Sequence, residues 1–239
     1  MVGRAAALLG LFLGLIVYYE TNEHWWQASL WWDVAFIACV LIPAVFALVL
    51  IVVPWYGTKE LWLFAAGIAC VVLAVVLELA DAEVFANFAR LGATTLLGWW
   101  FLSFFETVSW VVLVAAIIPW VDAYSVWRGP TKQIVEHHEH VFSVLSFAFP
   151  VPGEHAAANL GVPDLLFFAL FLAAAARFGL RVFATWLGLV AGLGVTIALT
   201  VYFDLSGLPA LPGISLGFLV PNADLVWRAV RKRSEPAVE

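Results

Sequence analysis

Long apolar runs follow one another along this chain, and most are separated only by short polar breaks. A helix needs about 20 mainly apolar residues to cross roughly 30 Å of hydrocarbon, and most of these runs reach about that length. The pattern therefore predicts an all-α fold, a polytopic transmembrane bundle of about eight spans. The predicted spans are residues 5–19, 30–53, 61–79, 84–104, 107–127, 157–180, 182–203 and 208–226.

Composition supports lipid as the main solvent of this protein. Hydrophobic residues make up 64% of the 239 residues and charged residues only 12%, whereas a soluble domain carries roughly 25% charged residues. The formal net charge of -6 argues against nucleic acid as a partner, because phosphate-binding surfaces are basic. Cys39 and Cys70 lie in apolar runs without CxxC spacing, so neither a disulfide framework nor a thiolate metal site is expected.

One long polar segment divides the predicted membrane domain, which covers residues 1–239. Residues 1–127 form the N-terminal helices, 128–156 the polar loop, 157–227 a C-terminal three-helix part, and 228–239 a basic tail. Basic residues in short loops favour the cytoplasmic side of a membrane. With eight spans, most of them fall on the side of the tail, which predicts a multi-pass integral membrane protein with a cytoplasmic C-terminus.

Two carboxylates stand deep inside predicted spans, where an ionisable group costs about 2.5 to 3.5 kcal/mol on insertion scales. At 1.5 Å per residue, Asp122 lies roughly 9 Å and Asp164 roughly 10 Å from the ends that open onto the polar loop. An antiparallel helix pair brings them to one level. Asp33 and Glu78 lie within about a turn of predicted span ends, and we expect both to be solvated there.

Two carboxyl groups a few ångströms apart in a low-dielectric site cannot both be ionised, so one is protonated while the other is charged. Such a pair can serve as acid and base in peptide hydrolysis. The same residues also suit two other interpretations. Each carboxyl group can satisfy a neighbouring helix, or the pair can couple protons or cations in a transporter.

Three motifs resemble those of the presenilin and signal-peptide-peptidase family of intramembrane aspartyl proteases, most of all its archaeal, presenilin-like members. The stretch Val-Asp-Ala-Tyr-Ser-Val at 121–126 is similar to the Tyr-Asp motif of that family. The stretch Gly-Val-Pro-Asp at 161–164 resembles its Gly-x-Gly-Asp motif, and Pro-Ala-Leu at 209–211 resembles its third motif. The family Tyr is Val121 here, and the Gly before the second Asp is Pro163.

The resemblance implies a presenilin-like fold in a prokaryotic cell membrane and a catalytic pair formed by Asp122 and Asp164. It implies substrate binding by Pro209, Ala210 and Leu211, together with the segment containing Gly161, Val162 and Pro163. The expected substrates are transmembrane helical peptides or signal-peptide remnants, and the chemistry needs no metal or organic cofactor. A relative that binds membrane helices without cutting them stays an alternative, as does the transporter.

Two further patterns have simpler interpretations. The sequence His-His-Glu-His at 137–140 lacks the i, i+4 spacing of a helical zinc motif, and we expect a solvated loop there. Gly188 and Gly192, within the small-residue stretch 187–195, are typical of close helix packing.

Overall fold

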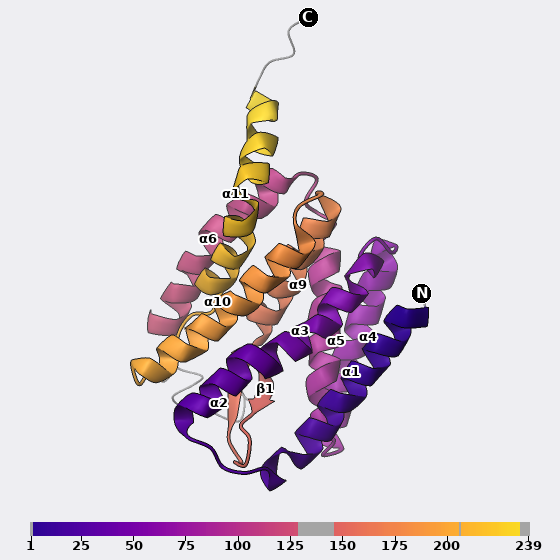
Figure 1. Ribbon diagram of the computed structural model, residues 1–239. Coiled ribbons are helices and arrows are strands. Elements are labelled where there is room, and N and C mark those ends of the chain that lie inside the picture. Colours follow the sequence, from indigo (N-terminus) through magenta and orange to yellow (C-terminus); the bar gives the residue numbers. More distant parts are fainter. Residues whose placement is uncertain (1, 129–145, 206, 235–239) are drawn as a thin grey trace, which may run out of the picture.

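The computed structural model describes residues 2–128, 146–205 and 207–234, and most of them are helical (Figure 1). A π-helical turn, Ile37–Leu41, joins α2 to α3, so these two labels belong to one continuous helix. The helices are α1 (Val2–Thr21), α2 (Leu30–Phe36), α3 (Ile42–Val52), α4 (Glu60–Leu79), α5 (Glu83–Leu102), α6 (Val108–Arg128), α9 (Val162–Arg177), α10 (Val182–Tyr202) and α11 (Leu211–Ser234).

Within those described parts, five helices are long and apolar enough to span a membrane. They are Gly3–His24, Leu30–Trp55, Glu60–Leu79, Val108–Val126 and Val182–Tyr202. The prediction of a helical bundle is thus confirmed, and a helix stands near each of the eight predicted spans. The helices α5, α9 and α11 do not belong to the five, so the number of spans stays a prediction.

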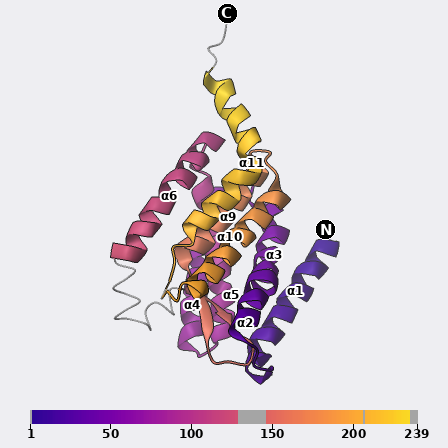
Figure 2. The same cartoon turned by 60° about the vertical axis from the view of Figure 1, so that its left-hand side comes forward.

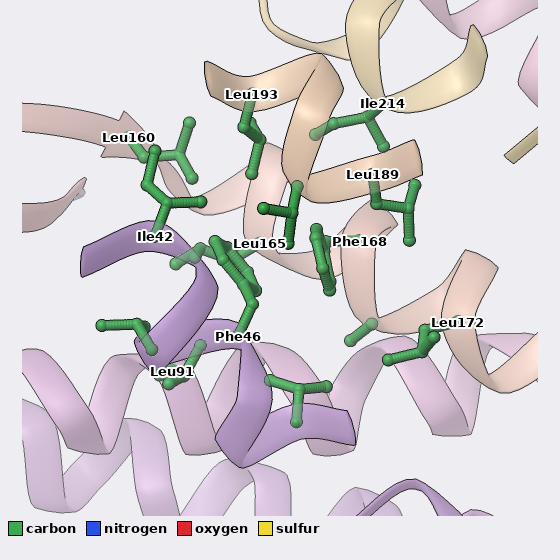
Figure 3. Packing of buried hydrophobic residues seen from close by; sticks show 14 of the residues in the cluster. Ile42, Phe46, Leu91, Leu160, Leu165, Phe168, Leu172, Leu189, Leu193 and Ile214 are labelled. Atoms are coloured by element: carbon green, nitrogen blue, oxygen red, sulfur yellow. The ribbon is translucent and has the colours of Figure 1, made fainter. Parts of the chain in front are cut away.

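Helix α9 occupies the centre of the bundle. Every residue from Phe168 to Ala175 is buried, on all faces of the helix. Figure 3 shows α9 meeting side chains from α3, α10 and α11, and the ring of Phe168 stacks on that of Phe46 with centroids 3.9 Å apart. A helix that is apolar all round belongs in the interior, so its neighbours fix the position of α9.

The predicted span 157–180 is wrong at its beginning. Residues Ala157–Gly161 form strand β2, which pairs antiparallel with β1 (Ser146–Pro150), and the helix starts only at Val162. Proline is tolerated in the first turn of a helix, but further inside it clashes with the preceding turn and removes a hydrogen bond. Pro163 therefore limits where the helix can start. A hydropathy profile does not show this limit, because it measures only how apolar a segment is.

Two predicted segments also differ from the structure. Strand β1 lies within the stretch 128–156, which was expected to be only a polar loop. At the other end, α11 extends to Ser234, so the basic tail 228–239 begins as helix.

Helices α10 and α11 approach each other through facing glycines, as the small-residue pattern predicted. A Cβ added at Gly188 would collide with the backbone of Gly217, and one added at Gly192 would collide with the backbone of Gly213. This contact leaves no room for side chains, so it sets the distance between the two helices.

Gly192→Ala is expected to lower the free energy of unfolding by about 1–3 kcal/mol, because the new methyl group overlaps backbone atoms of α11. Gly14→Ala is the matched control, since a Cβ there meets nothing within 4 Å. It should leave stability unchanged or raise it by up to about 1 kcal/mol through helix propensity. Unfolding midpoints in mixed micelles measure both effects, and equal shifts would contradict the glycine contact.

Candidate active site

Asp122 lies in the last third of α6, and its carboxyl group reaches the start of α11. The backbone N–H of Leu211 donates a hydrogen bond to Asp122 Oδ2 at 3.0 Å. The N–H of Ala210 donates to the same carboxyl group. Figure 2 shows α6 at the edge of the bundle, beside α11. The fold therefore joins the first aspartate to the Pro-Ala-Leu segment, 89 residues later in the chain.

The start of α11 needs such a partner. The first backbone N–H groups of any helix have no acceptor within it. The first helical hydrogen bond of α11 is donated by the backbone N–H of Ile214 to the C=O of Ala210, at 3.1 Å. Pro212 has no N–H that needs an acceptor. Asp122 accepts from donors that the helix leaves open, as an N-capping side chain does, although it belongs to another helix.

Asp164 is the third residue of α9. The prediction that it lies roughly 10 Å from the start of its helix is therefore wrong. The helix begins after Gly161, whose backbone is extended (φ -64°, ψ 150°). The backbone N–H of Gly161 donates to the Asp164 carboxyl group, which is the backward half of a capping box. A Cβ at residue 161 would lie 3.2 Å from Asp164 Oδ2, so glycine keeps that space open.

The two carboxyl groups interact electrostatically across the gap between α6 and α9. No hydrogen bond between them is found in the part of the chain that the structure describes. Each sits at the positive end of a helix, Asp122 at α11 and Asp164 at α9, and a helix N-terminus stabilises a nearby negative charge. The arrangement suits a pair of carboxyl groups that carries a single charge.

The two departures from the motifs of the resembled family occupy positions that suit these residue types. Pro163 is the second residue of α9, where a backbone N–H would lack a helical acceptor in any case. Val121 is 54% exposed, so its side chain points out of the bundle. Val162, between the N-cap and Pro163, is the first helical residue and is half-buried.

The hairpin before Asp164 was missed by sequence reasoning, and side chains of the N-terminal helices hold it in place. Asn87 of α5 bonds both the N–H and the C=O of Ala148, each at 2.9 Å. The hydroxyl of Tyr19 also donates to Ala148 O, at 2.9 Å, and that of Tyr18 donates to Pro150 O, at 2.8 Å. The outer edge of β1 is therefore covered.

The outer edge of β2 is unpaired within the described part of the chain. Ala148 lies opposite Asn159, and directly opposed residues of an antiparallel pair orient their backbone groups alike. The N–H and C=O groups of Asn159 therefore point away from β1, as do those of Ala157. They have no backbone partner among residues 2–128, 146–205 and 207–234. This edge leads straight to Asp164.

Other candidate residues fall outside this site. Residues 137–140, the histidine cluster, lie outside the described residues, and His155 pairs with Glu23 at 2.8 Å. The described parts hold no group of three or more His, Cys, Asp or Glu side chains fit for a metal ion.

The two carboxylates expected to be solvated have different surroundings. Glu78 forms an ion pair with Arg90. Asp33 is not solvated but buried, 6% exposed, although it lies in the first turn of α2, because that end of the helix packs against α10.

Asp122→Ala is expected to raise the exchange rate of the Leu211 amide about fivefold, since losing an N-cap costs about 1 kcal/mol. Asp122→Asn keeps an acceptor oxygen and should leave that rate close to wild type. Hydrogen–deuterium exchange with single-residue fragmentation measures both. Equal protection of Leu211 in all three proteins would mean that the carboxyl group does not hold the start of α11.

Comparison with known proteins adds no assignment to this geometry. No protein-family model matches the chain, and no curated protein matches it in sequence. A functional interpretation of the site therefore depends on its own residues, on their arrangement, and on the three motifs.

Proposed function

We propose that this protein is an intramembrane aspartyl protease that uses Asp122 and Asp164 to cut transmembrane segments or signal-peptide remnants. The observation that carries the proposal is the electrostatic pairing of these carboxyl groups beside the backbone N–H of Leu211. In the same proposal the chain is a multi-pass protein of a prokaryotic cell membrane with about eight spans, a presenilin-like fold and a cytoplasmic C-terminus.

The reaction follows from one shared proton. The ionised carboxylate takes a proton from water as the water oxygen bonds to the peptide carbonyl carbon. The protonated carboxyl group gives its proton to the carbonyl oxygen, which forms a tetrahedral gem-diol. When the C–N bond breaks, the carboxyl group that received the water proton passes it to the leaving nitrogen, while the other carboxylate takes a proton from one hydroxyl of the gem-diol as that oxygen re-forms the C=O bond. The pair again holds one proton, and no cofactor enters.

The helix ends support this chemistry through fixed dipoles. The amides at the start of α11 and α9 donate to Asp122 and Asp164 respectively. These donors stabilise the one negative charge while their own positions stay fixed by the fold. The pair can therefore be charged in a site that excludes most water.

The open edge of β2 provides a way to present the substrate. A helical peptide hides its scissile bonds within its own hydrogen-bonded turns, so it must be extended before it is cut. An extended peptide can add to an exposed strand edge through main-chain hydrogen bonds. The backbone groups of Ala157 and Asn159, which have no backbone partner among the described residues, offer that edge five and three residues before Val162 at the start of α9. The proposal also assigns Pro209, Ala210 and Leu211 to substrate binding, because Ala210 and Leu211 donate to Asp122.

Purified protein in detergent is expected to cleave members of a panel of transmembrane peptides, detected by mass spectrometry. Asp122→Ala and Asp164→Ala should each lower the rate about 100- to 10,000-fold, as expected when an acid–base group is lost. Glu106→Ala is the control, because Glu106 is an exposed carboxylate in the turn between α5 and α6. Its rate should equal that of the wild type.

Two results would count against the protease. The first is no product from wild type under conditions in which an active member of the resembled family cuts the same peptides. The second is ion or proton flux through protein-containing liposomes that both Asp variants abolish, which would favour a carrier. Peptide binding without cleavage, unchanged in both Asp→Asn variants, would instead favour a helix-binding protein.

Pro163→Gly, which restores the family residue, should leave the cleavage products unchanged, because Pro163 is exposed and its missing N–H costs α9 no bond. The variant should also be about 0.4–1 kcal/mol less stable, since glycine gives the unfolded chain more freedom. Cleavage assays and unfolding midpoints test the two parts separately. A large gain in rate would show that proline distorts the site.

A further inference from the structure

The side chain of Asn87 pairs with strand β1 as a neighbouring strand would. Asn87 belongs to α5 and is 3% exposed. Its Nδ2 donates to the backbone O of Ala148 at 2.9 Å, and its Oδ1 accepts from the backbone N–H of Ala148 at 2.9 Å. Two opposed residues of an antiparallel pair exchange hydrogen bonds in the same way. One amide thus satisfies both backbone groups that the middle residue of β1 turns away from β2.

This contact permits one alignment of β1 on α5. A shift by one residue would turn the two buried phenylalanine rings of β1 to the other face of the hairpin. A shift by two residues in one direction would bring Pro150 to Asn87, and proline has no N–H to donate to Oδ1. A shift in the other direction would separate the backbone O of Ser146 from Arg90 Nη1, which donates to it at 3.2 Å. Side chains of α5 therefore select the observed register.

Helix α5 also holds the second aspartate helix. A Cβ added at Gly98 would lie 2.7 Å from the backbone O of Leu166, so α5 and α9 approach backbone to backbone there. Asn87 lies about three turns before Gly98 on the same helix, at 3.6 residues per turn. One helix therefore fixes the positions of both β1 and α9.

The hairpin joins α9 without an intervening loop. Strand β2 ends at Gly161, and the helix starts at the next residue. The angle between them depends on the backbone of Gly161, which has no side chain to limit it. A peptide added to the edge of β2 would turn with the hairpin about this residue, relative to Asp164. The hydrogen bonds of Asn87 oppose that rotation, because Ala148 lies opposite the middle residue of β2.

We infer that Asn87 is a positioning residue of the proposed protease. Its side-chain amide holds the hairpin at Ala148 and so determines which peptide bond of a docked substrate lies beside Asp164. This role rests on the proposed function, and it adds a determinant of the cleavage position that lies outside the three motifs. Both hydrogen bonds of the amide go to the hairpin, so Asn87 acts through β2 and not on the reacting atoms.

The cleavage products of a single transmembrane peptide test this role. Asn87→Leu keeps a branched side chain of similar shape but removes both hydrogen bonds to β1. The main wild-type product should fall about tenfold relative to products cut at neighbouring peptide bonds, as for the loss of such hydrogen bonds. Mass spectrometry reads this ratio within one digest. A loss of folded protein lowers all products together and leaves the ratio unchanged.

Thr94→Val is the matched control. Thr94 lies on the same helix and is 4% exposed, and its hydroxyl group bonds carbonyl groups of α5, those of Arg90 and Leu91. The substitution therefore removes buried hydrogen bonds from α5 without touching the hairpin. Its product ratio should equal that of the wild type.

Hydrogen–deuterium exchange reads the same contact without cleavage. The exchange rate of the Ala148 amide should rise about tenfold in Asn87→Leu and stay at the wild-type value in Thr94→Val. Asp122→Ala should leave it unchanged, which separates the contact from the chemistry. If Asn87→Leu cannot be purified, Tyr19→Phe replaces it in the cleavage assay, because it removes the other donor to Ala148 O.

Each contrary result has its own meaning. Wild-type product proportions from Asn87→Leu, or an Ala148 exchange rate that does not respond to it, would overturn the positioning role and leave the protease standing. Equal changes of the product ratio in Asn87→Leu and Thr94→Val would show that any disturbance of α5 alters cleavage, which also overturns the role. No product from the wild type would overturn the protease, and this role with it.

Discussion

The backbone N–H groups at the start of a helix have no acceptor within that helix, and lipid offers none. This protein answers that constraint with carboxyl groups at two helix starts. Asp122 accepts from the first residues of α11, and Asp164 accepts from the N-cap of α9. The same hydrogen bonds stabilise two carboxyl groups that would otherwise be expensive inside a membrane. Helix capping and the candidate chemistry therefore depend on one set of contacts.

The rest of the bundle fixes where those two helix starts lie. Helix α9 is buried on every side, so its neighbours leave it one position. The glycine contact with α10 then sets the position of α11, since no side chain separates the two backbones. Helix α6 packs mainly on α11 and lies at the edge of the bundle (Figure 2). Helix α11 thus sets the position of Asp122 relative to Asp164, because it packs against both α6 and α9.

The N-terminal helices support the site although they carry none of its motifs. Asn87 and Arg90 of α5, with Tyr18 and Tyr19 of α1, bind backbone groups of β1. Buried polar groups of this kind are satisfied by one arrangement only, so they fix the register and direction of the strand. Among the residues that the structure describes, the outer edge of β2, directly before Asp164, has no backbone partner.

The sequence by itself determined the helical fold, because about 20 apolar residues in a row leave a membrane chain few other structures. It also indicated Asp122, Asp164 and the Pro-Ala-Leu segment as candidate site residues, because a motif is defined by residue type and order, which can be read directly from the sequence. Only the tertiary structure decided that residues 157–161 form a strand, that Asp33 is buried, and that Asp122 meets Leu211. Hydropathy measures how well a segment suits lipid, but pairing and capping depend on which groups from distant segments come within hydrogen-bonding distance.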